Sequence, residues 1–192
     1  MPTFTAKATI KKVPFVGRIA KACNNLFLDR SSPESRKLVA QKIAEKQMIC
    51  EKDPRFDPLI IFPEGGTTNG DYLIKFKKGA FLGEHSVLPF VFKYDSVYFS
   101  PNLAAFDMVA SVYLSCYVPY SRITKIDLPI FKPNEYFFSH HQREGEERWE
   151  TYARVVRDIM SEVSGIPTLD VDIEDKFEYL KVLKECGKQK HK

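Results

Sequence analysis

Motifs for a metal site or for a disulfide framework are missing from this 192-residue sequence. Its four cysteines lie far apart, with no Cys-x-x-Cys pair and no companion histidine at metal-ligand spacing. They are Cys23, Cys50, Cys116 and Cys186. We therefore expect no metal ion and a domain that faces a reducing compartment.

Long apolar segments are also missing. No signal peptide opens the sequence, and the longest mostly apolar stretch, Leu103 to Val118, is short for a bilayer span and contains Asp107. We expect that stretch to form a buried or interfacial helix. The sequence also lacks internal repeats, low-complexity tracts and linkers, which favours one domain over residues 1–180 and a basic, disordered tail over residues 181–192.

Charge of one sign does not dominate the sequence, since the net charge is only +4. The positive excess is concentrated in the first thirty residues and the last dozen. The basic N-terminal segment should favour anionic surfaces such as a membrane. A basic C-terminal end of this kind is more often solvated. No nucleic-acid-binding motif accompanies these residues, so we expect no nucleic-acid partner.

Strand and helix patterns alternate along the chain. This alternation predicts a single α/β domain with a mixed or largely parallel central sheet flanked by helices. The clearest helix signal is the three- and four-residue spacing of apolar residues before Gly165 and Pro167. The predicted helices cover residues 15–22, 33–49, 103–116, 146–164 and 174–185. The predicted strands cover residues 26–28, 59–62, 87–94 and 125–130, the last with Ile126, Leu128 and Ile130 on one face.

The segment with the most chemical information follows the apolar strand at residues 59–62. We call its residues 64–70 the glycine loop. Glycines allow a backbone to turn sharply and aim N–H groups at a ligand, and hydroxyl and amide side chains add further donors. The loop contains Gly65, Gly66, Gly70, Thr67, Thr68 and Asn69, and Lys75, Lys77 and Lys78 follow it. This combination is typical of a phosphate site, although a glycine loop that only connects two elements remains the alternative.

A nucleotide-binding P-loop does not fit the same segment. Gly65 and Gly70 have the glycine spacing of that motif, but Asp71 and Tyr72 occupy the positions where Lys and Ser or Thr must contact phosphate and magnesium. The sequence also lacks a Gly-x-Gly-x-x-Gly motif. We therefore expect the loop to bind a phosphate that is not part of a nucleoside triphosphate.

With its flanks, the loop resembles the third sequence block of the glycerol-phosphate and lysophospholipid acyltransferases. That block has the form Phe-Pro-Glu-Gly-Thr, and here it is Phe62-Pro63-Glu64-Gly65-Gly66, with Gly66 in place of the usual threonine. The second block is matched over residues 13–30, up to Arg30, and the fourth block over residues 87–94. The Thr-Asn ending and the Lys-x-x-x-Gly-Ala-Phe at residues 75–81 are similar to the lysophosphatidylcholine acyltransferase branch.

The resemblance implies transfer of a fatty acyl group from acyl-CoA, a co-substrate, to the hydroxyl of a lysophospholipid. No other cofactor is implied, and a membrane-associated enzyme, in the endoplasmic reticulum, is what the family suggests. The catalytic first block of the family, His-x-x-x-x-Asp, is missing, because none of the four histidines has an aspartate at that offset. We expect the chain to be an N-terminally incomplete, inactive piece of such an enzyme. The alternative is a short, catalytically inactive module that binds phosphate, acyl-CoA or membranes.

The resemblance assigns substrate binding to residues of the second and third blocks. Arg30 is the best candidate for direct phosphate pairing, with a structural salt bridge to Asp29 or Glu34 as the alternative. Glu64 is expected to hold the catalytic histidine or the loop backbone, and a helix or turn cap is its alternative. The full set of candidate binding residues is Arg30, Glu64, Gly65, Gly66, Thr67, Thr68, Asn69, Lys75 and Lys78. For the two lysines a solvated basic face is equally expected.

Overall fold

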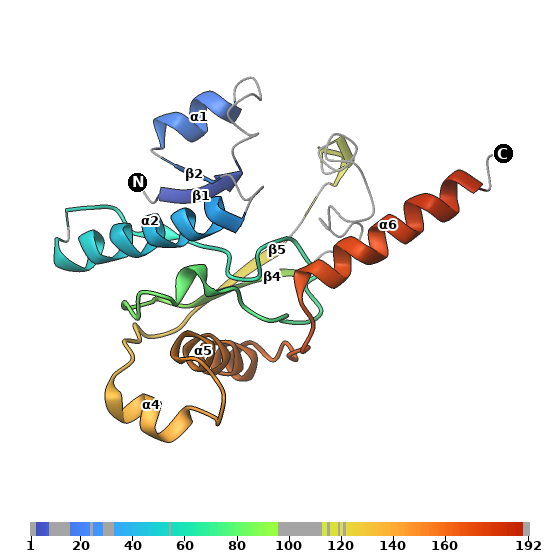
Figure 1. The fold of residues 1–192 in the computed structure, drawn as a ribbon. Coiled ribbons are helices and arrows are strands. Elements are labelled where there is room, and N and C mark those ends of the chain that lie inside the picture. The colour runs from blue at the N-terminus through green and yellow to red at the C-terminus, as the bar shows by residue number, and fades with distance from the viewer. Residues whose placement is uncertain are drawn as a thin grey trace. The chain divides into compact units, whose positions relative to one another are not determined.

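The computed structural model describes residues 3–7, 16–23, 25–28, 33–53, 55–95, 113–114, 116–118, 120 and 122–189 (Figure 1). The chain divides into two compact units, each assembled from separate segments. Unit 1 consists of residues 1–63, 77–87 and 130–153, and unit 2 consists of residues 64–76, 88–129 and 154–192. We describe each unit by itself.

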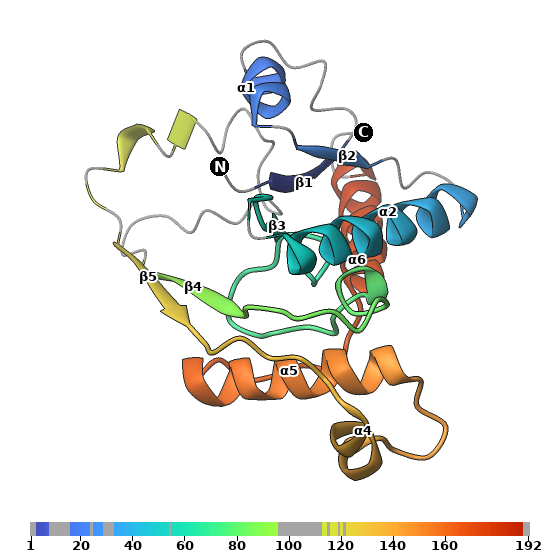
Figure 2. The ribbon, with the colours of Figure 1, turned by 90° about the vertical axis from the view of Figure 1, so that its left-hand side faces the viewer.

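Unit 1 contains a three-stranded parallel sheet in the order β2-β1-β3 (Figure 2). Its strands are β1 (Thr3–Lys7), β2 (Leu26–Leu28) and β3 (Leu59–Ile60). The central strand, β1, pairs in parallel with both neighbours. Helix α1 (Val16–Ala22) connects β1 to β2, as parallel pairing requires a crossover between the strands.

The long helix of unit 1 is α2 (Pro33–Lys52), which packs beside the short 3₁₀ helix η2 (Lys78–Ala80). Ala40 and Ile43 of α2 are buried. Gln47 donates a hydrogen bond of 2.9 Å from its side chain to the carbonyl of Ala80, which satisfies a group at the end of η2. The helix therefore anchors the segment that follows the predicted phosphate site in the sequence.

Aromatic side chains form a second part of the core of unit 1. Tyr152, which has no exposed surface, has its ring 5.1 Å from that of Phe81 and 5.7 Å from that of Phe131. Its hydroxyl donates to the carbonyls of His85 and Phe131. The remaining helix of the unit, α4 (Glu135–His141), begins at Asn134, whose side chain accepts a hydrogen bond from the amide of Phe137.

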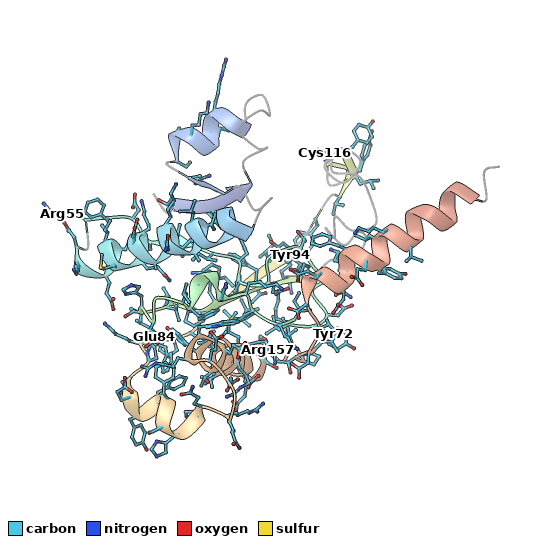
Figure 3. All side chains as sticks on the ribbon, viewed as in Figure 1. Arg55, Tyr72, Glu84, Tyr94, Cys116 and Arg157 are labelled. Carbon is cyan, nitrogen blue, oxygen red and sulfur yellow. The ribbon has the colours of Figure 1, made fainter. Side chains whose placement is uncertain are left out.

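Unit 2 contains an antiparallel pair of strands, β4 (Phe90–Asp95) and β5 (Arg122–Asp127), and helix α6 (Ile173–Gln189). Helix α5 (Arg148–Ser164) begins in unit 1 and ends in unit 2. Its second half buries Val156, Arg157 and Met160, of which Figure 3 labels Arg157. The segment after α5 runs beside the residues that follow the glycine loop, with a parallel bridge between Leu73 and Thr168.

The elements agree with an α/β chain, and most of the sequence-based boundaries are close. Two elements were not predicted from the sequence, β1 and α4. The strand predicted at residues 125–130 lies earlier, at Arg122–Asp127, and Ile130 is 71% exposed instead of facing the core with Leu128. Helix α6 continues to Gln189, into the segment predicted as a tail. The helix predicted at residues 103–116 lies mostly outside the described residues.

No helix among the described residues is both long enough and apolar enough to cross a lipid bilayer.

Candidate anion-binding site

The glycine loop has a backbone that only glycine adopts readily. Gly65 has a φ angle of 79° and Gly70 a φ angle of 83°, so both ends of the loop are in the left-handed region. Between them, no backbone amide from Glu64 to Gly70 donates a hydrogen bond to any group in the described part of the chain. The loop therefore presents several N–H donors that the described protein groups leave available.

Glu64 stabilises the glycine loop through a hydrogen bond within the loop. Its carboxylate accepts a hydrogen bond of 3.2 Å from the hydroxyl of Thr68. Burial raises the pKa of the Glu64 carboxyl, and the hydrogen bond from Thr68 opposes that rise. A carboxyl with a raised pKa takes up a proton more readily beside an anion, which lessens the repulsion that an ordinary glutamate would exert.

Asn69 and Asp71 form two further hydrogen bonds where the loop ends. The side-chain amide of Asn69 donates to the Asp71 carboxylate at 2.6 Å, and its oxygen accepts from the Asp71 amide at 3.4 Å. The Asn69 side chain therefore already has partners on both sides. The side chain of Thr67 is exposed, and its hydroxyl group has no hydrogen-bond partner within the described residues.

Gly66 touches the first turn of α6. A Cβ atom built on Gly66 would lie 2.9 Å from Cγ1 of Ile173, closer than real Cβ contacts come, and 3.0 Å from its Cδ1, which is tighter than most such contacts. Ile173 is itself buried, with 4% of its surface exposed. The glycine that replaces the usual threonine of the third block therefore has a steric reason in this structure: the volume of a side chain is occupied by Ile173.

Lys176 is a loop contact that sequence reasoning missed. Its ammonium group donates a hydrogen bond to the carbonyl of Thr67, although the two residues are 109 positions apart. Burial lowers the pKa of Lys176. The sequence does predict a helix at residues 174–185 with charged residues in its first turns. That pattern does not specify which of these residues contacts the loop.

The segment after the loop is fixed by backbone hydrogen bonds within unit 2. The amide of Leu73 donates to Pro167 at 2.9 Å, and the amide of Lys75 donates to Val171 at 3.1 Å. Leu73 is buried, whereas the side chain of Lys75 is exposed. This pairing holds the end of the loop against the connection between α5 and α6.

The structure brings together part of the predicted binding set. Glu64, Gly65, Gly66, Thr67, Thr68, Asn69 and Lys75 all belong to unit 2. Lys78, which is exposed, begins η2 in unit 1. Arg30 lies outside the described residues, so its pairing with phosphate stays a prediction. The role of the unit 2 residues in binding an anion also stays a prediction.

Within the described part of the chain, no group of three histidine, cysteine, aspartate or glutamate side chains is arranged to hold a metal ion.

Comparison with known proteins connects this site to one family. Residues 1–92 match the family model described as Acyltransferase. The chain is 32% identical over 184 residues to the lysophospholipid acyltransferase LPEAT1 of Arabidopsis thaliana, a match that covers 93% of this chain and 43% of the relative. No solved structure matches the chain.

Two further relatives are lysophosphatidylcholine acyltransferases. The Drosophila melanogaster protein is 28% identical over 176 residues, which cover 91% of this chain and 31% of the relative. The human lysophosphatidylcholine acyltransferase 2 is 28% identical over 185 residues, which cover 91% of this chain and 30% of the relative. The chain therefore spans less than half the length of each of these three relatives. The resemblance seen in the sequence motifs is confirmed.

Proposed function

We propose that this protein transfers a fatty acyl group from acyl-CoA to the hydroxyl of a lysophospholipid. The proposal rests on the match to the Acyltransferase family model and on the similarity to lysophospholipid acyltransferases. In this proposal the chain contributes the part of the site that binds the phosphate of the acceptor. The observation that carries the proposal is the glycine loop, where two positive-φ glycines flank backbone amides that make no hydrogen bond within the described residues.

A phosphate suits these donors better than other headgroup chemistry. Successive backbone N–H groups make a concave site for anions, and a phosphate offers several oxygens that can each accept from a different amide. The residues proposed to bind it are those of the third block, together with Arg30, whose guanidinium matches two phosphate oxygens at once. Glu64 then acts on the loop by holding Thr68 and does not contact the phosphate itself.

The finer features of the proposal follow from the family resemblance. We propose that β1, β2 and β3 form part of a larger mixed central sheet, and that the enzyme works at the membrane of the endoplasmic reticulum. The acyl-transfer chemistry is assigned to a His-x-x-x-x-Asp block, which the 192 residues do not contain. The alternative function is a catalytically inactive module that binds phosphate, acyl-CoA or a membrane.

The first prediction tests the site assignment through activity. In the chain preceded by a segment that carries the His-x-x-x-x-Asp block, Arg30→Ala or Glu64→Ala should lower kcat/KM for lysophosphatidylcholine by at least ~10-fold, about 1.4 kcal/mol of transition-state stabilisation. The measurement is transfer of a labelled acyl group from acyl-CoA. Wild-type rates in both variants would contradict the assignment.

Two matched controls accompany that measurement. Arg55→Ala removes an arginine whose side chain is 89% exposed and pairs with nearby Asp53, and Glu162→Ala removes an exposed glutamate of α5. Both controls should keep the wild-type rate. Acyl transfer by the chain that carries the added His-x-x-x-x-Asp block distinguishes the proposed enzyme from the alternative binding module, because the module would bind a headgroup without catalysing a reaction.

The second prediction tests the backbone of the loop. A Cβ added at Gly70 would meet no atom within 4 Å, so Gly70→Ala changes only the backbone energy at φ 83°. We expect it to lower the free energy of unfolding by about 1 kcal/mol and the affinity for glycerophosphocholine by roughly threefold or more. Urea denaturation and calorimetric titration measure the two effects.

Gly145 provides the matched control for this change. It has a φ angle of 79° and open space around its Cβ position, but it lies outside the glycine loop. Gly145→Ala should therefore have a similar effect on stability and none on headgroup binding. Equal affinities for the two variants would mean that the backbone of the loop does not bind the headgroup.

A further inference from the structure

We propose that Lys176 of α6 is a positioning residue for the headgroup phosphate: it fixes the Thr67–Thr68 peptide so that the N–H of Thr68 faces the ligand. This inference rests on the proposed function of the glycine loop. It adds a residue from a helix far downstream of the four sequence blocks that identify the family.

The argument begins with the planarity of the peptide unit. The carbonyl of Thr67 and the N–H of Thr68 belong to one trans peptide group, in which the C=O and N–H bonds point in opposite directions. The ammonium of Lys176 donates a hydrogen bond to the Thr67 carbonyl. The N–H of Thr68 must therefore point away from Lys176. Within the described residues, that N–H has no acceptor.

Without Lys176 the same peptide could turn over. Rotation of the Thr67–Thr68 peptide group needs only compensating changes in ψ of Thr67 and φ of Thr68, and within the described residues no hydrogen bond other than that from Lys176 holds this group. A turned peptide would present the Thr67 carbonyl, an oxygen with partial negative charge, where the N–H had been. A phosphate would then meet an acceptor in place of a donor. The lysine acts on the ligand through this peptide.

A second contact keeps the start of α6 against the loop. Ile173 lies in the space that a side chain at Gly66 would need, and Phe177 comes within 4.0 Å of the same point. The first turn of α6 is further fixed by a hydrogen bond of 3.0 Å from the amide of Asp172 to the carboxylate of Asp175. Lys176, one turn after Ile173, is therefore held at the loop by the packing of its own helix.

The partly buried position of Lys176 agrees with a fixed ammonium group. Burial lowers its pKa, whereas a lysine that extended freely into water would experience no such effect. An exposed lysine on the same helix, Lys181, provides the comparison. The two side chains are chemically identical, and the structure gives only one of them a hydrogen bond to the loop.

The test uses the 192-residue chain labelled with nitrogen-15, with glycerophosphocholine as the headgroup probe. In the wild-type chain the amide signals of residues 65–70, Thr68 among them, should shift on titration. Lys176→Met should move the Thr68 amide signal before any probe is added and weaken probe affinity by at least ~5-fold. Lys176→Arg should restore both, since arginine keeps a charged donor. Lys181→Met should match the wild type.

The outcomes separate this inference from the proposed function. If the wild-type loop amides do not respond to the probe, both the loop assignment and the role of Lys176 are wrong. If they respond and Lys176→Met binds with wild-type affinity, only the role of Lys176 is wrong. Methionine keeps the unbranched stem of lysine, so the variant should retain its fold. Loss of the fold, seen by circular dichroism, or failure of Lys176→Arg to restore binding would also overturn the positioning role.

Discussion

Replacing Asp170 with asparagine should lower the free energy of unfolding by about 2 to 3 kcal/mol, a large effect for one exposed side chain. Asp170 accepts a hydrogen bond of 2.8 Å from the guanidinium of Arg157. The Asp170 side chain is 76% exposed, whereas that of Arg157 is 8% exposed. The variant would therefore leave a buried positive charge without its carboxylate. Urea denaturation of both proteins at neutral pH measures the difference.

Burial of the Arg157 guanidinium has a second energetic cost, which affects the size of the expected change in stability. Its Nε and Nη1 atoms are buried and have no hydrogen-bond partner among the residues that the structure describes, and Asp158 lies 3.9 Å from Nε, beyond hydrogen-bond distance. A buried ion pair of this kind contributes little net stability, because removing the guanidinium from water offsets most of the attraction. Arg157→Met should therefore cost less than about 1 kcal/mol or even stabilise the chain.

The two variants together decide between two explanations. If the pair is a stabilising salt bridge, both substitutions should destabilise the chain to a similar degree. If the buried charge is the dominant effect, Asp170→Asn should be clearly the more harmful. An equal loss for both variants would contradict our account. The result also concerns the candidate site, because the neighbours of Asp170, Leu169 and Val171, pair with the segment that follows the glycine loop.

Local patterns in the sequence were enough to predict most of the regular elements. The apolar spacing before Gly165 predicts α5, and Tyr152, Val156 and Met160 are indeed buried. The same spacing also placed Ile159 and Val163 on the buried face, and both are exposed, at 39% and 53%. Arg157 takes a place on the buried face instead, because its long aliphatic stem can pack like an apolar residue. Residue type alone gives no sign of that exchange.

Elements that depend on distant partners were the ones missed. Strand β1 is a short segment of mixed polarity in a basic stretch, with Thr3 buried at 3% exposure. It becomes a strand through parallel pairing with β2 and β3, which come from later parts of the chain. No local propensity in residues 3–7 could reveal that both its edges are paired.

The candidate site shows the same division. Gly65, Gly70 and Glu64 were identified from one contiguous motif, whose glycines have the left-handed backbone that such a loop needs. Lys176 and Ile173 contact the loop from α6, and nothing in their local sequence distinguishes them from other helix residues. The reason for Gly66 also became visible only with Ile173 in place. Contacts across a hundred residues are set by tertiary packing, which a single sequence does not display.

The acid dependence of stability should depend strongly on Glu51, at the end of α2. Its carboxylate accepts hydrogen bonds from Lys132 at 2.7 Å, from Ser86 at 2.7 Å and from His85 at 2.9 Å. These bonds, that from Lys132 foremost, lower the pKa of Glu51 from 4.5 to about 2. A carboxylate at a helix C-terminus is ordinarily unfavourable, so the three donors must offset the helix dipole as well.

The direction of the pH effect follows from the sign of this change. Because the folded-state pKa lies below the unfolded value of 4.5, the cluster stabilises the chain above pH 4.5 and loses its contribution as the pH falls towards 2. Glu51→Gln should lower the free energy of unfolding by about 2 kcal/mol at pH 7, an amount reduced by the solvent exposure of the group. The difference from wild type should shrink as the pH falls from 5 to 3.

Urea denaturation of both proteins at pH 7, 5 and 3 gives the comparison, with Glu162→Gln as the control. Glu162 is an exposed glutamate, so its replacement should leave the pH dependence of stability unchanged. Because the Glu51 cluster joins α2 to residues on two other segments of unit 1, its loss should act on that unit as a whole. A constant difference between Glu51→Gln and wild type across the three pH values would show that the carboxylate of Glu51 does not carry the effect.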